Sequence, residues 1–170
     1  MNTNSALEKR VALRPPRHAL DWRAIAWWRA QSALVFGIPV VALVVLGLLL
    51  PDARVPLLVP GVVLAVLGAA WVIALPLWWY RVHRWENTET AVYTRSGFVW
   101  QEWRVAPLSR IQTVDTLRGP LEQLFGLATL TVTTASARGA IKIRGLDAEV
   151  AARVAEQLTE LTQATPGDAT

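Results

Sequence analysis

Two uncharged apolar runs, residues 30–50 and 55–80, dominate the first half of the chain, and only four residues separate them. A helix of about 20 residues, rising roughly 1.5 Å per residue, crosses a hydrocarbon core of about 30 Å. The pattern therefore predicts two transmembrane helices, over about residues 28–50 and 56–79. Because the connection is so short, the helices are expected to run antiparallel as a hairpin, with everything before and after it on one side of the membrane.

Beyond residue 80 the pattern changes to an alternation of apolar and polar positions interrupted by turn residues, which is typical of antiparallel strands. Arg95, Ser96 and Gly97 are expected to form a hairpin turn, with glycine supplying a positive φ. Pro107 is expected to end the return strand. The predicted strands are 90–94, 98–105, 111–117, 129–135 and 140–144, with a further one starting within 80–86.

The last element is expected to be an amphipathic helix. Asp147 is a plausible N-cap, and the apolar positions that follow it recur on one helical face. These positions are Val150, Val154, Leu158 and Leu161. The predicted fold is an α+β membrane protein in which a two-helix transmembrane hairpin precedes a curved β-sheet or small barrel capped by the C-terminal helix. The expected organisation is a disordered basic tail (1–20), an interfacial helix and hairpin beginning at Asp21 (21–80), a folded domain (81–162) and a disordered tail (163–170).

Two pairs of tryptophans mark the same end of the two predicted spans. One pair opens the first span and the other closes the second, so the pairs are expected at equal depth. Indole rings favour the headgroup boundary, where the apolar body and the N–H group are both satisfied. With the neighbouring arginines they are predicted to anchor the hairpin. The predicted membrane-interface anchors are Trp27, Trp28, Arg29, Trp78, Trp79, Arg81 and Arg84.

The positive charge is confined to the start of the chain. Residues 1–29 hold six basic and two acidic side chains, which accounts for the whole net charge of +4. The remainder is balanced, so no basic stripe of the kind that binds nucleic acid is expected on the domain. Basic residues flank the open end of the hairpin, whereas the turn carries only Arg54 beside Asp52. By the positive-inside rule both termini are predicted to be cytoplasmic, which places the protein in the inner membrane.

The residues that support common enzyme chemistry are scarce. The chain has no cysteine, and its two histidines are His18 in the tail and His83 beside the membrane. No P-loop, G-x-S-x-G or G-x-G-x-x-G motif occurs. We expect no enzymatic activity, no cofactor, no metal site and no small-molecule substrate.

Three stretches together resemble one family. They are residues 107–114 (PLSRIQTV), residues 119–135 (GPLEQLFG followed by LATLTVTTA) and residues 145–151 (GLDAEVA). The chain resembles the YdbS-like bacterial pleckstrin-homology (PH) proteins, also called membrane-flanked domain proteins. The resemblance implies a PH-like fold, a curved seven-stranded sheet or barrel capped by the C-terminal helix. The strands that the pattern does not show would then be the segment near Trp85 and something irregular around residues 120–127.

Three functions stay open. The favoured hypothesis is a membrane-anchored interaction module that binds another membrane protein or itself; the family resemblance connects such a module with envelope stress or antimicrobial-peptide immunity. One alternative is recognition of anionic lipid headgroups, with Arg95, Arg104 and Arg110 as candidate lipid or partner contacts. The other is an accessory subunit of a membrane transport or secretion complex.

Overall fold

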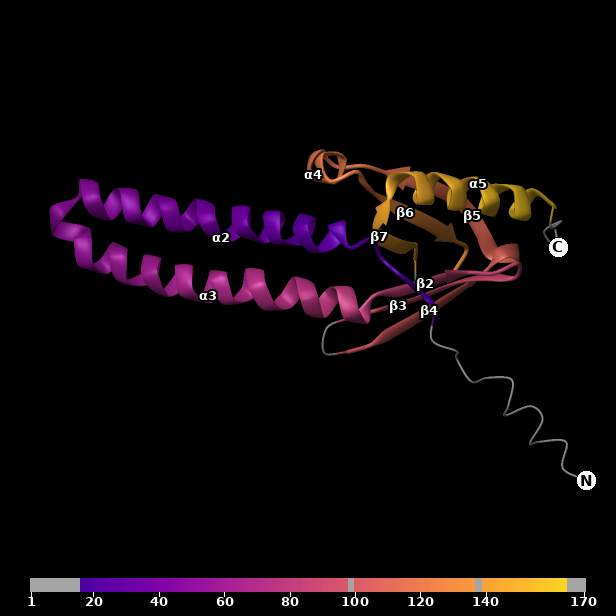
Figure 1. Cartoon of the computed structure of the whole chain (residues 1–170), viewed down its shortest axis with the longest axis horizontal. Helices are drawn as coiled ribbons and strands as arrows, with labels where there is room; N and C mark the ends of the chain where they lie inside the picture. Colours follow the sequence, from indigo (N-terminus) through magenta and orange to yellow (C-terminus); the bar gives the residue numbers. More distant parts are fainter. Residues whose placement is uncertain (1–15, 98–99, 137–138, 165–170) are drawn as a thin grey trace, which may run out of the picture.

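The computed structural model describes residues 16–97, 100–136 and 139–164. Two long helices, α2 (Arg23–Leu49) and α3 (Arg54–Val82), lie side by side and antiparallel, joined by the 3-10 turn η1 (Pro51–Ala53). They project from one end of the folded domain (Figure 1). Both helices are long and apolar enough to cross a membrane, and most of their surface is not covered by protein. The predicted hairpin is confirmed.

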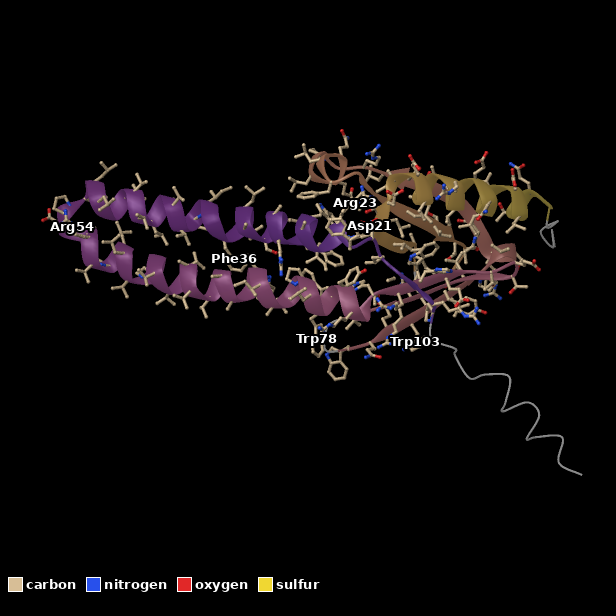
Figure 2. All side chains as sticks on the ribbon, in the orientation of Figure 1. Asp21, Arg23, Phe36, Arg54, Trp78 and Trp103 are labelled. Atoms are coloured by element: carbon tan, nitrogen blue, oxygen red, sulfur yellow. The ribbon has the colours of Figure 1, made fainter. Side chains whose placement is uncertain are left out.

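The two helices approach closely where glycine faces a large side chain. A Cβ added at Gly68 would lie 2.9 Å from the Cβ of Phe36, and one added at Gly47 would lie 2.9 Å from the side chain of Leu58. Phe36 lies between the helices (Figure 2), and its ring centroid is 6.0 Å from that of Trp71. Small residues at these positions allow the backbones to pack together in lipid.

The domain contains two antiparallel sheets. One has four strands in the order β1–β2–β3–β4 and the other has three in the order β5–β6–β7. Helix α5 covers the second sheet, and the short helix α4 lies on the hairpin side of the domain (Figure 1). The elements are β1 (His18–Ala19), β2 (Arg84–Asn87), β3 (Ala91–Ser96), β4 (Glu102–Pro107), the 3-10 turn η2 (Leu108–Arg110), β5 (Ile111–Leu117), α4 (Pro120–Leu124), β6 (Leu127–Thr134), β7 (Ile141–Asp147) and α5 (Ala148–Ala164).

Most of the predicted elements are present, with some changed boundaries. The strand over residues 111–117 and the helix after Asp147 are confirmed; the Asp147 carboxylate accepts hydrogen bonds from the backbone N–H groups of Glu149 and Val150. The hairpin turn over residues 95–97 is wrong at its start, because β3 continues through Ser96. Its return strand begins at Glu102, and residues 98–99 lie outside the described residues.

The segment before the hairpin belongs to the domain. His18 pairs with Trp85 and Ala19 with Arg84, and the indole N–H of Trp85 donates to the carbonyl of Ala19 at 3.2 Å. Leu20, which follows this strand, is buried in the core. The prediction of a disordered tail through residue 20 is therefore wrong for residues 16–20. The membrane hairpin is an insertion between the first and second strands of the sheet.

One hydrophobic core runs from the domain into the open end of the hairpin. Ala24, Trp27 and Trp28 of α2 are buried in the same cluster as the inward-facing residues of the two sheets and α5. Among those inward-facing residues are Val92, Leu127, Leu130, Val132, Ile143, Leu146 and Leu158. Because the hairpin and the domain share a core, the hairpin is not connected through a flexible tether.

The start of α2 is fastened to the start of α5. The Asp21 carboxylate accepts from the backbone N–H of Arg23 at 2.8 Å, and the two residues lie together at the start of α2 (Figure 2). The Arg23 guanidinium also donates to the carboxylate of Asp147. The backbone N–H of Asp21 donates to the carbonyl of Gly145 at 3.1 Å. Gly145 has φ +77°, and a Cβ at this position would lie 2.8 Å from the Cβ of Ala24. Glycine is needed here both for its backbone conformation and for the close approach of α2.

Candidate functional site

A groove lies where the hairpin enters the domain. It consists of two adjoining cavities, of about 400 and 340 Å³, which share Trp28, Trp79, Lys142 and Arg144. We call these two cavities together the junction groove. The first also contains His83, Thr94, Ser96, Glu102, Arg104, Ala140 and Ile141. The second also contains Trp27, Gln31, Leu117, Glu122, Thr129 and Thr131.

The alternation of side chains along the strands explains which residues enter the groove. Lys142 and Arg144 are two residues apart on β7 and share one face, while Ile141 and Ile143 are buried. In the other sheet, Thr94 of β3 is paired with Arg104 of β4, so both side chains lie on the same face. The groove thus receives one row of side chains from each sheet.

Arg104 connects the two sheets at the groove. Its guanidinium donates to the carbonyl of Ala140 at 2.8 Å and forms an ion pair with Glu102 at 2.9 Å. Lys142 and Arg144 are exposed, and neither is within ion-pair distance of a carboxylate in the described part of the chain. Two uncompensated cations therefore face the groove.

The carboxylate in the second cavity is hydrogen-bonded within the domain. Glu122 is buried, accepts from the Thr129 hydroxyl at 2.6 Å and accepts from the backbone N–H of Gly119 at 2.8 Å. Its oxygen atoms are thus engaged with the domain itself. Glu122 consequently fixes α4 onto β6.

His83 lines the groove as a neutral side chain. Burial lowers the pKa of His83 below its ordinary value of 6.5, and the nearby charge of Arg144 lowers it further, against the opposing effect of a hydrogen bond to the carbonyl of Trp79. The Nδ1 atom lies 2.8 Å from that carbonyl oxygen. The ring also contacts Trp28, with centroids 5.8 Å apart. A neutral imidazole near pH 7 leaves the charge of the groove to Arg104, Lys142 and Arg144.

The residues predicted as membrane-interface anchors occupy different environments. Trp27 and Trp28 are only 8% and 7% exposed and belong to the domain core, so they contact protein rather than a free lipid-facing surface. Trp79 is half-buried and meets Trp28 edge to face at 5.7 Å, whereas Trp78 is 52% exposed and points outward from the base of α3 (Figure 2). That the anchors bind at the headgroup boundary stays a prediction.

The arginines among the predicted anchors also differ. Arg81 is exposed and Arg29 is half-buried. Arg84 donates to the carbonyls of Tyr80 and His83, at 2.9 and 3.0 Å, and thereby caps the end of α3. The structure thus assigns Arg84 a local role in ending the second span.

The three candidate contact residues do not form one cluster. Arg104 lies in the junction groove. Arg95 follows Thr94 on β3, so its side chain lies on the opposite face, and its guanidinium is 5.5 Å from the centre of the Trp103 ring. Arg110 is exposed at the end of η2 and lines neither cavity. The sequence analysis missed Lys142 and Arg144, although the alternation over residues 141–144 was the signal that could have identified them.

Within residues 16–97, 100–136 and 139–164, no group of three or more side chains is arranged to hold a metal ion. The groove presents cations, hydroxyl groups and indole rings. These groups are suited to holding an anion beside an apolar surface.

The comparisons with known proteins agree with this architecture. The family model described as Bacterial PH domain matches residues 32–162, which include most of the hairpin and the domain. The chain is 26% identical over 160 residues to the transmembrane protein YdbS of Bacillus subtilis (strain 168), an alignment that covers 90% of this chain and 97% of that protein. No solved structure matches the chain significantly. The chain belongs to the bacterial PH domain family and is a membrane protein with a PH-like domain.

Proposed function

We propose that this protein is a non-enzymatic, membrane-anchored recognition module that binds anionic lipid headgroups in the junction groove. The observation that carries the proposal is the pair of unpaired cations, Lys142 and Arg144, beside the indoles of Trp28 and Trp79. The family is described as a PH domain and the relative YdbS as a transmembrane protein, and neither description names an enzymatic activity. The sequence alone favours a protein partner, whereas the cations and indole rings of the junction groove favour a lipid as its ligand.

The position of the groove relative to the hairpin supports a lipid ligand. About 20 residues of α3 counted from Pro56 reach residue 75, so Trp79 follows about one turn beyond the hydrocarbon boundary. That is the level of the lipid phosphates. Each cavity has a volume of the size that holds a small ligand. A phosphate entering from the leaflet would meet Lys142 and Arg144 while its glycerol backbone lies against the indoles.

The distribution of charge supports a cytoplasmic domain. The open end of the hairpin carries Arg17, Arg23, Arg29, Arg81 and Arg84, whereas the tip carries Arg54 beside Asp52 (Figure 2). Short segments rich in arginine stay in the cytoplasm. A reporter active only in the periplasm, fused after Thr170, is expected to be inactive. An active reporter would contradict the orientation and with it the choice of leaflet.

The headgroup proposal is tested by lipid binding to the full-length protein in mild detergent. Native mass spectrometry would count bound dioctanoyl phosphatidylglycerol and phosphatidylcholine. The double variant K142Q/R144Q removes two cations worth about 1 kcal/mol each near an anionic surface, so its affinity for phosphatidylglycerol should fall roughly 30-fold. The matched control R110Q/R153Q removes two exposed arginines that lie outside the groove and should bind as the wild type does.

Three results separate the alternatives. Equal binding of both lipids by the wild type, or equal losses in the two double variants, would refute selective headgroup binding. Competition by inorganic phosphate alone would show that the groove takes a free anion rather than a lipid. If a membrane protein co-purifies in stoichiometric amount with the wild type but not with K142Q/R144Q, while lipid binding is unchanged, the result would favour a protein partner in the groove.

A further inference from the structure

An exposed apolar surface lies beside the hairpin and adjoins the second cavity of the junction groove, which Leu117 also lines. It is formed by Leu117 at the end of β5 and by Leu124 of α4, which are 67% and 80% exposed. We call this pair the α4 surface.

The α4 surface is held at a definite depth along α2. Pro120 and Leu121 of α4 line a cavity together with Trp27 and Gln31 of α2. Leu117 also lines a cavity together with Gln31. Gln31 is one turn further along α2 than Trp27, toward the tip of the hairpin. Figure 1 accordingly shows α4 alongside the base of α2, at the extreme hairpin side of the domain.

Counting along the span places this level at the edge of the hydrocarbon. About 20 residues are needed to cross the core, and 20 residues counted back from Leu49 begin at Ala30. Gln31 therefore lies at the boundary on the side of the domain. The end of β5 and helix α4, which lie beside Gln31, are therefore expected at the same depth as this boundary.

The local chemistry of α4 favours contact with lipid over contact with water. Leu121 and Phe125 turn inward and pack against the core, so the exposure of Leu124 is not a consequence of missing core space. Glu122 is buried and hydrogen-bonded, which leaves Arg118 as the exposed charge of this segment. An exposed arginine beside apolar side chains suits a headgroup region, where the guanidinium meets phosphate and the leucines meet acyl chains.

We propose that the α4 surface inserts into the leaflet beside α2, so that the domain contacts the membrane through Leu117 and Leu124 in addition to the hairpin. The occupant is lipid because the surface is continuous with the lipid-facing side of the span. This inference rests on the hairpin and not on headgroup binding in the junction groove, so either proposal can fail alone. Insertion of α4 would hold the groove at a constant distance from the bilayer.

The absence of cysteine from the chain makes the test direct. Single variants L117C and L124C, labelled with a nitroxide in the full-length protein in lipid nanodiscs, are compared by power saturation with oxygen and with a water-soluble nickel chelate. V66C, on the exposed surface of the middle of α3, is the lipid reference, and E160C, exposed on α5, is the water reference. Both α4 labels should be relaxed more strongly by oxygen than by nickel, as V66C is.

Two results would overturn the proposal. Nickel accessibility of L117C and L124C equal to that of E160C would place the α4 surface in water. Dipolar broadening between labels, lost on dilution with unlabelled protein, would show that a second copy covers the surface instead of lipid. Because both leucines are exposed, the variants should keep the wild-type Tm, and a preserved Tm excludes misfolding as the source of either result.

Discussion

Gly145 of the domain lies close against Ala24 of the hairpin, and replacing Gly145 by alanine should loosen this contact. A non-glycine residue at φ +77° costs about 1–2 kcal/mol. The added Cβ would also lie 2.8 Å from the Cβ of Ala24, and overpacking of this kind costs about 1–3 kcal/mol. We therefore expect G145A to lower the free energy of unfolding by roughly 2–5 kcal/mol.

Gly139 supplies a matched control. It has φ +73°, but nothing lies within 4 Å of an added Cβ. G139A should therefore show the conformational cost alone, about 1–2 kcal/mol. The difference in free energy of unfolding between G145A and G139A therefore measures the cost of the steric contact between β7 and α2.

The assay is thermal unfolding of the full-length protein in detergent, followed by tryptophan emission. Trp27 reports on this contact because its ring lies 3.9 Å from the position of the added Cβ. For a domain of 60–100 residues, about 1 kcal/mol corresponds to a shift of roughly 4–8 °C in Tm. G145A should thus unfold at least about 4 °C below G139A.

A second substitution tests the cause directly. A24G removes the Cβ that the new alanine would meet, although by itself it costs about 1 kcal/mol of helix stability. In the double variant G145A/A24G, part of the loss should be recovered, which is a favourable interaction energy in the double-mutant cycle. A Tm for G145A as high as that of G139A, or strictly additive losses in the cycle, would refute the reasoning.

Two further predictions concern the stability of the same assembly. Although burial opposes it, the backbone N–H of Val150 and the Arg23 guanidinium lower the pKa of Asp147 below 3.8. The stabilisation that Asp147 gives the folded state is therefore complete above pH 3.8 and is lost as the pH falls through its lower, folded pKa. The Tm of the wild type should fall more steeply than that of D147N on acidification from pH 5. Parallel curves of Tm against pH would contradict this role of Asp147. In the hairpin, G68A should lower Tm because the added Cβ would lie 2.9 Å from the Cβ of Phe36. The control G37A should leave Tm unchanged, because nothing lies within 4 Å of a Cβ added there. Equal Tm values for the two variants would show that the helices separate freely at Gly68.

The parts that the sequence predicted correctly are those with a long or repeated signal. The two spans are each more than 25 residues long in the structure, and buried and exposed positions alternate over residues 141–144 of β7. Asp147 could be identified as a cap because the apolar face of α5 begins directly after it. Local physical chemistry determines each of these elements.

The parts that were missed depend on contacts between distant residues. Strand β1 has only two residues, too few for any alternation, and it forms because Trp85 lies opposite it. The role of Trp27 and Trp28 was equally hidden, since a tryptophan pair before a span looks the same whether it faces lipid or a protein core. Burial of both rings follows from the position of α2 against β7, which no local pattern contains.

The insertion of the hairpin between β1 and β2 makes correct membrane insertion a condition for completing the sheet. Ala19 and Trp85 are 66 residues apart in the chain yet share a hydrogen bond. If the segment between them were a flexible loop, its closure would cost about 3–4 kcal/mol in entropy. The antiparallel spans bring Ala19 and Trp85 close together before β1 and β2 pair. Formation of the hairpin therefore removes most of this loop-closure cost. Conversely, a chain in which only one span inserts would leave β1 and β2 on opposite sides of the membrane, and its domain core would lack Leu20 and Trp28.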